Sequence, residues 1–243
     1  MFNRLVRSPI VYPYLLIATA ISIAIGVYSE SKILLPLLNI AAAYPVMFTL
    51  LRFEQRKRAI GTMLFWALCM AVLMVYTCVH FPLQAEASIF HGKAYAAEMM
   101  NWVRTGNAAE NEPLRFVPQH LLHFFVFVAL SLLTGSLLSL LMGALLMNYM
   151  CFYVGTLVNA AAHPLTATLM GWQPYAIIRV CSYVILGVIL GEPMICRVLK
   201  KDYEYDLKLR PFYWAALTGV VLDIIIKFAI APWWGLVLRA AMR

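Results

Sequence analysis

Charged residues are scarce in this 243-residue chain, at 12% of the sequence against roughly 25% in soluble globular domains. Cysteines are also few, and five of them do not suit a disulfide-stapled secreted domain. Hydrophobic residues instead reach 63%, and the mean hydropathy is +0.81. This composition excludes a disordered chain, a coiled coil and an ordinary soluble enzyme. It predicts an all-α polytopic membrane protein, with residues 1–243 forming a single integral membrane domain.

The chain also lacks the short motifs that carry a known chemistry. It has no P-loop, no dinucleotide-binding glycine fingerprint, no Gly-x-Ser-x-Gly, no His-Glu-x-x-His and no Cys-x-x-Cys. We therefore expect no cofactor, and an enzymatic function is not indicated. The absence of catalytic motifs favours an integral membrane subunit or scaffold of a membrane complex.

Long apolar runs supply the membrane spans, since a bilayer core of roughly 30 Å needs about 20 apolar residues per helix. The runs cover residues 10–28, 33–51, 60–82, 120–162, 174–190 and 212–231. One helix over the fourth run would be about 65 Å long, too long for a single crossing. We expect that run to form a tight helical hairpin turning between Ser139 and Asn148, which gives about seven spans. A re-entrant pair that stays on one side of the bilayer fits the same run.

Lysine and arginine cluster in short segments between the runs, and such segments remain in the cytoplasm. The clusters are Arg4 and Arg7; Arg52, Arg56, Lys57 and Arg58; and Arg197, Lys200, Lys201, Lys208 and Arg210. They predict a multi-pass protein of a bacterial inner membrane with a cytoplasmic N-terminus. The net charge of +8 then reflects topology and attraction to anionic lipids of the bilayer. It does not indicate nucleic-acid binding, because the basic residues flank spans and form no single face.

The largest polar segment, residues 83–118, is expected on the outer side of the membrane, opposite the cytoplasm. Within it, residues 93–105 are good helix formers, and Gly106 suits the residue after a helix end. We expect a short amphipathic helix that lies on the membrane with Trp102 near the headgroups. The segment either connects and caps the spans or acts as a lid or docking surface.

Small residues recur at every fourth position over Ser131, Gly135, Ser139 and Gly143. This spacing lets helix backbones approach closely. We expect the hairpin to pack against a neighbouring span through these residues, with no room for a larger side chain at Gly135 or Gly143. Contact with a partner membrane protein or a second copy of the chain is the alternative.

Charged residues inside the spans are candidates for function, because each costs about 2.5–3.5 kcal/mol on insertion scales. Asp223 and Lys227 are four residues apart and share a helix face, so we expect a mutually compensating pair. Arg179 should lie at a similar depth. The three residues either fix helix register or form a polar cavity, and the cavity would suit a transporter or channel for a small anionic or lipid-like substrate. Glu192 is expected at the cytoplasmic interface.

All the histidines fall on the predicted outer side of the membrane. Four of them lie at the ends of spans: His80, His120, His123 and His163. Interfacial histidine is common, so a structural role is the simplest interpretation. Because histidine is also the commonest metal ligand, a membrane enzyme with an outer-face histidine metal site is a further alternative.

Overall fold

The computed structural model describes residues 2–106, 111–204 and 206–242, and these are folded into helices without any strand. Residues 107–110 of the polar segment lie outside the described residues. The α-helices are α1 (Phe2–Val6), α2 (Val11–Tyr28), α3 (Leu34–Arg52), α4 (Arg56–His80), α5 (Pro82–Ser88), α6 (Gly92–Thr105), α7 (Pro113–Thr134), α8 (Leu137–Ala160), α9 (Pro164–Gly171), α10 (Pro174–Val198) and α11 (Arg210–Ala241).

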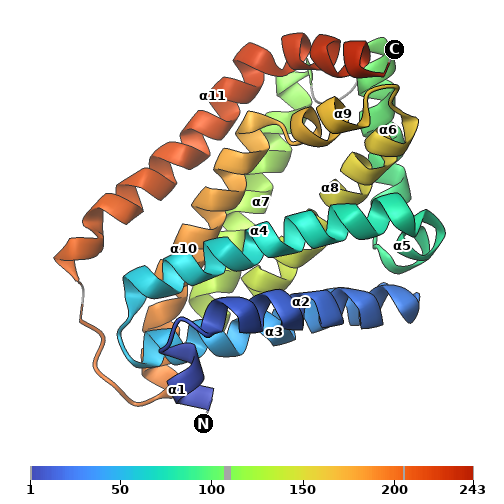
Figure 1. Cartoon of the computed structure of the whole chain (residues 1–243). Coiled ribbons are helices and arrows are strands. Elements are labelled where there is room, and N and C mark those ends of the chain that lie inside the picture. The colour runs from blue at the N-terminus through green and yellow to red at the C-terminus, as the bar shows by residue number, and fades with distance from the viewer. Residues whose placement is uncertain (1, 107–110, 205, 243) are drawn as a thin grey trace.

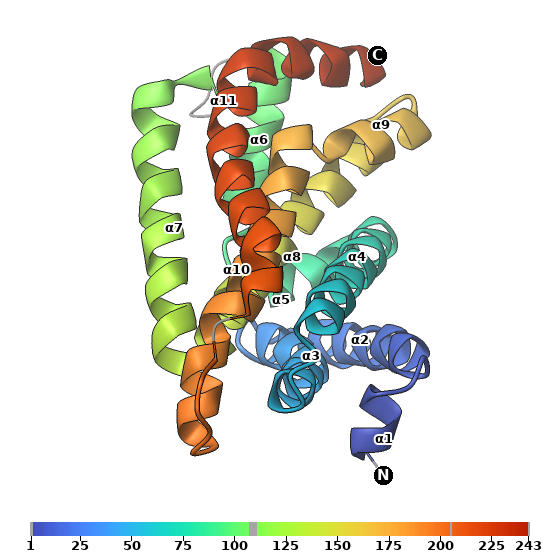
Figure 2. The same cartoon turned by 90° about the vertical axis from the view of Figure 1, so that its left-hand side faces the viewer.

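Seven of these helices, α2, α3, α4, α7, α8, α10 and α11, are long and apolar enough to cross a membrane. The shortest has 18 residues, or about 27 Å of helix, which matches the hydrocarbon core. The predicted all-α fold with about seven spans is therefore confirmed. The N-terminus and α1 lie at one end of the bundle, whereas α6, α9 and the C-terminus lie at the opposite end (Figures 1 and 2).

Two residues, Gly135 and Ser136, connect α7 to α8, and both have left-handed backbone angles, with φ of 57° and 67°. The turn therefore comes before the predicted range, and Ser139 and Asn148 both lie within α8. The prediction of its position was wrong because no charged residue or proline marks it. The sequence feature that marks the turn is Gly135, since glycine takes a left-handed conformation without steric cost. Ser136 is held there by its hydroxyl, which donates to the Gly187 carbonyl of α10.

The turn divides the row of small residues between two helices. Ser131 lies in the last turn of α7, and Ser139 lies in the first turn of α8. Both residues are fully buried. A Cβ atom on Gly135 would lie 3.0 Å from Ile195 of α10, so the backbones are close there. A Cβ atom on Gly143 would meet nothing within 4 Å. The prediction of tight packing at Gly143 was wrong, because the turn resets the helical register and leaves this glycine on a cavity wall.

Helix α6 ends at Gly106, which has a φ of 80°. Its apolar face packs against α8 and α11. Trp102 is fully buried, contacts Gly235 of α11, and donates a hydrogen bond to the Asn111 side chain at 3.0 Å. The protein itself therefore covers the apolar face of α6, so Trp102 does not contact lipid, and the depth of α6 in the membrane stays a prediction.

Helix α11 is 32 residues long and contains Pro232. Figure 2 shows that it rises along the bundle and then turns over the end that carries α6 and α9. Trp234 donates to the Met170 carbonyl of α9, and Arg239 donates to the Val103 carbonyl of α6, both at 2.9 Å. Together α6, α9 and the last turns of α11 close this end of the bundle.

At the opposite end, a buried ion pair joins α4 to α10. The Nε atom of Arg56 lies 2.6 Å and 2.8 Å from the two carboxylate oxygens of Glu192. The Glu192 side chain is only 2% exposed, so the protein covers it; its position at the cytoplasmic interface stays a prediction. Arg56 also donates to the Glu204 carbonyl at 3.1 Å and thereby ties the segment before α11 to the bundle.

Candidate functional site

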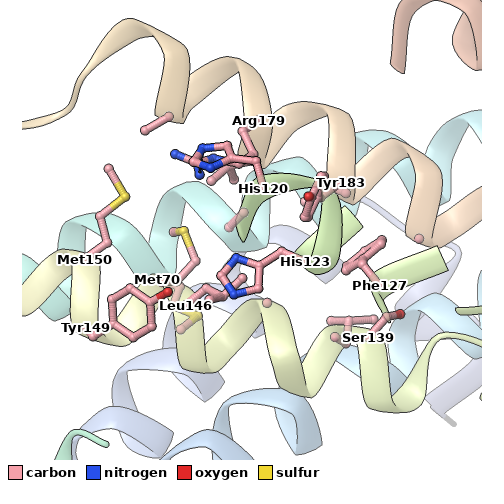
Figure 3. Close-up of a pocket in the computed structure, with 18 of the residues that line it drawn as sticks. Met70, His120, His123, Phe127, Ser139, Leu146, Tyr149, Met150, Arg179 and Tyr183 are labelled. Carbon is pink, nitrogen blue, oxygen red and sulfur yellow. Dashed lines mark hydrogen bonds between the residues drawn. The ribbon is translucent and has the colours of Figure 1, made fainter. Parts of the chain in front are cut away.

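A cavity of about 170 Å³ lies among the helices, and α3, α4, α6, α7, α8, α10 and α11 all contribute to its wall (Figure 3). Most of the lining side chains are apolar. Six are methionines: Met47, Met63, Met70, Met99, Met147 and Met150. Methionine is unbranched and polarizable, so such a wall adapts to apolar molecules of irregular shape.

The polar end of this cavity is built on Arg179 of α10 and His120 of α7 (Figure 3). The Nη1 atom of Arg179 lies 2.6 Å from Nε2 of His120. The other ring nitrogen, Nδ1, lies 2.8 Å from the Phe116 carbonyl oxygen. A carbonyl only accepts, so we assign the proton to Nδ1, and Nε2 then accepts from the guanidinium. In this arrangement His120 is neutral and orients Arg179.

Asp223 of α11 is the acidic residue that lies next to both Arg179 and His120. Its Oδ2 atom lies 3.5 Å from Nε of Arg179 and 3.8 Å from Nε2 of His120, and the residue is only 2% exposed. Three helices therefore bring one acidic, one basic and one imidazole side chain together. The structure places Arg179 beside Asp223, as the sequence suggests, and adds His120 as their common neighbour.

Lys227 lies one turn further along α11 and is also 2% exposed. Its Nζ atom is 4.6 Å from the ring centroid of Phe116 and 5.6 Å from that of Tyr175. Aromatic faces attract cations at these distances. Asp223 and Lys227 thus both face the protein interior. Their mutual compensation stays a prediction.

The polar end of the cavity presents mainly positive charge and hydrogen-bond donors. Arg179 and Lys227 line it, together with Tyr183 and the half-buried His123, whereas Asp223 stands behind Arg179. Glu98 is the acidic residue in the lining, and it is exposed. A guanidinium fixed in this way suits a carboxylate or phosphate, because its N–H groups match the geometry of paired oxygens.

The histidines of the predicted metal site are spread over different places. His120 and His123 line the cavity, but His80 stacks on Tyr76 at the end of α4, and the exposed His163 precedes α9. Within residues 2–106, 111–204 and 206–242, no three histidine, cysteine, aspartate or glutamate side chains lie close enough to share a metal ion.

Sequence reasoning missed Phe116 and Tyr175 and did not connect His120 to Arg179. The signal was present as a repeated spacing of four residues. Phe116 precedes His120 on α7, Tyr175 precedes Arg179 on α10, and Asp223 precedes Lys227 on α11. Residues four apart share a helix face, so each of the three helices presents one such pair to the others.

The chain matches no family model, no curated protein and no solved structure. Its function is therefore inferred from the cavity and its polar end. The relevant facts are the apolar volume, the charges that face it and the groups that hold those charges in place.

Proposed function

We propose that the protein is a membrane carrier that binds an amphiphile with an anionic headgroup, such as a phosphate or carboxylate. The observation that carries this proposal is the methionine-lined cavity with Arg179 and Lys227 at one end. A headgroup beside Arg179 would gain charge-assisted hydrogen bonds. An apolar tail in the cavity would gain about 25 cal/mol for each Å² removed from water.

Asp223 and His120 would act as positioning residues for the headgroup. They contact Arg179 through different nitrogens, Nε and Nη1, and so restrict rotation of the guanidinium plane. A preoriented side chain loses less entropy when the ligand binds. Solvent screens the exposed carboxylate of Glu98 more strongly than the buried charges, so the buried end of the cavity stays attractive to an anion.

The scaffold function predicted from the sequence has no comparably specific support. Ser131 and Ser139 are fully buried, and Gly135 lies against α10. These small residues are therefore occupied within the chain. The transporter alternative, by contrast, is supported by a cavity that includes two of its three predicted residues, with the third, Asp223, in direct contact with Arg179.

We also propose that the polar end of the cavity faces the outside of a bacterial inner membrane, with the N-terminus in the cytoplasm. Support comes from the basic segments around Arg4, Arg56 and Lys200, which belong to the end of the bundle opposite α6 and α9 (Figure 1). Segments rich in lysine and arginine remain in the cytoplasm.

Cysteines introduced at two exposed lysines test this orientation, in a variant whose five native cysteines are replaced by alanine. A membrane-impermeant maleimide on intact cells should modify Lys93→Cys, at the start of α6, and spare Lys57→Cys, at the start of α4. Both positions should react once the membrane is opened. Labelling of Lys57→Cys alone in intact cells would reverse the proposed orientation.

Filling the cavity should abolish binding of an anionic amphiphile without unfolding the protein. Gly143→Leu adds a side chain where a Cβ atom meets nothing within 4 Å and where the wall faces the cavity. The affinity for dodecyl phosphate should fall at least about tenfold, or ~1.4 kcal/mol. The measurement is tryptophan fluorescence in phosphatidylcholine nanodiscs, because Trp66 lines the cavity.

Gly61→Leu is the matched control, since a Cβ atom there also meets nothing within 4 Å but the residue is exposed on α4. Both substitutions raise helix propensity equally. Gly61→Leu should bind dodecyl phosphate as the wild type does, and Arg179→Gln should bind it more weakly. Equal binding by Gly143→Leu and wild type would reject the site. Equal affinity for inorganic phosphate and dodecyl phosphate would reject the amphiphile.

A further inference from the structure

We propose that a groove between α4 and α10 is the lateral entry by which the tail of the amphiphile passes from the bilayer into the central cavity. This inference rests on the proposed function and adds the route that the ligand takes. The groove has a volume of about 660 Å³. It is bounded by α4, α8, α9, α10 and the residues that link α9 to α10.

The groove and the central cavity share part of their walls. Ala67 of α4, Met147 of α8 and Val180 of α10 line both spaces. A single layer of side chains from three helices therefore separates the groove from the cavity. Alanine is small and methionine has three rotatable bonds, so this layer offers little bulk at Ala67 and an adaptable side chain at Met147.

The size of the central cavity requires such a connection. Its volume of about 170 Å³ is below the roughly 300–1,000 Å³ of sites that enclose a drug-sized ligand. A headgroup and the first part of a tail fit there, but a full alkyl chain does not. The groove supplies the remaining volume on the side where the wall is thin.

The groove is apolar along its sides and has polar residues at one end, as an amphiphile requires. Its sides are apolar, and Leu68 and Val72 are each 61% exposed. Its polar residues include His80, at the end of α4, and Thr168, on α9. Both belong to the same end of the bundle as Arg179, which lies near the start of α10. A ligand with its headgroup at that end and its tail along the apolar sides matches the orientation expected in the cavity.

Photocrosslinking tests the route directly. A dodecyl phosphate analogue with a diazirine at the end of its tail is added to the protein in phosphatidylcholine nanodiscs and activated by light. Crosslinked peptides should come from residues 64–80 and 168–181, which border the groove. Crosslinks on α7 and α11 with none in these two segments would overturn the proposed route.

Bulky substitutions test whether the groove limits the rate of entry. Cys181→Trp and Leu169→Trp both place an indole in the groove, at positions outside the cavity lining. Each should slow association of dodecyl phosphate at least tenfold. Ile225→Trp is the control, because Ile225 is 55% exposed on α11, outside the groove. Use of two groove variants keeps the test decisive if one of them fails to fold.

Failure of the route is distinguishable from failure of the proposed function. Unchanged association rates in the folded groove variants, together with weak binding by Gly143→Leu, would reject the entry and keep the cavity. Normal binding by Gly143→Leu would reject the cavity itself. Slow association in the groove variants with unchanged rates in Ile225→Trp is the result expected from lateral entry.

Discussion

Asp223→Asn should strongly reduce the yield of folded protein. The carboxylate is 2% exposed and lies 3.5 Å from Arg179, so its loss removes the negative charge that faces the half-buried guanidinium of Arg179. Breaking a buried pair by removal of one partner typically costs about 3–5 kcal/mol. Fluorescence-detected size-exclusion chromatography of detergent extracts measures the folded fraction. An unchanged folded fraction would show that Asp223 is not part of a buried ion pair.

Two double variants separate the partners of Asp223. Asp223→Asn with Arg179→Gln removes the ion pair that the structure places at 3.5 Å. Asp223→Asn with Lys227→Met removes the pair expected from a spacing of four residues. We expect the first double variant to recover more folded protein. Greater recovery by the second would show that Lys227 is the dominant partner. Recovered folding without binding of dodecyl phosphate would assign these residues to the ligand site.

Glu192→Gln should also lower stability by several kcal/mol, because it leaves the charge of Arg56 with only the more distant carboxylate of Asp206, at 3.8 Å. Both contacts, at 2.6 Å and 2.8 Å, are charge-assisted and largely buried, with side-chain exposures of 13% and 2%. Thermal unfolding in detergent should show a lower Tm. Proteolysis near residues 199–204 should also become faster, because Arg56 holds the Glu204 carbonyl.

Glu112→Gln is the matched control for Glu192→Gln. Its carboxylate pairs with Arg115 at 3.3 Å, but the two side chains are 54% and 65% exposed. Exposed pairs contribute about 0–1 kcal/mol, so the Tm should hardly change. Equal shifts for the two variants would show that the Arg56–Glu192 pair is no more than a surface contact. The double variant Arg56→Met with Glu192→Met should recover much of the lost stability.

The spans were predictable because membrane insertion imposes a strong and local requirement on sequence. Each predicted apolar run corresponds to one long helix or, in the case of residues 120–162, two. Such helices satisfy their own backbone hydrogen bonds, so their existence depends little on tertiary contacts. Gly106 was equally informative, since its left-handed backbone ends α6.

The errors concern features that depend on packing between distant parts of the chain. Trp102 has the composition signal of an interfacial residue, but Gly235 of α11 lies against it. The position of Glu192 in its apolar run gives no sign of its partner Arg56, which is 136 residues away in the sequence. Gly143 belongs to the small-residue row in the sequence, but the turn at Gly135 directs it to the cavity. The partners of Trp102 and Glu192 lie far outside a local window, whereas the turn that redirects Gly143 is only eight residues away, at Gly135.

The charged residues of the candidate site were predictable from the sequence, but their arrangement was not. Charge inside a span is costly, which singles out Arg179, Asp223 and Lys227 without any structure. The arrangement around them depends on which helices are neighbours, and a run of apolar residues carries little information about that. His120 therefore seemed equivalent to the other histidines, although it is the one whose ring contacts Arg179.

Phe116 connects the segment that precedes α7 to the charged residues of the cavity. Its carbonyl accepts from His120, the partner of Arg179, and its ring faces Lys227, so one residue in the first turn of α7 is linked to both cations. The chain just before α7 is tethered to α6 by the bond between Asn111 and Trp102. A ligand that shifts Arg179 or Lys227 far enough to move Phe116 would also displace the chain that carries this tether. Because linkage is reciprocal, a molecule on the exposed face of α6 whose affinity depends on the bound amphiphile would change the affinity for the amphiphile by that same factor.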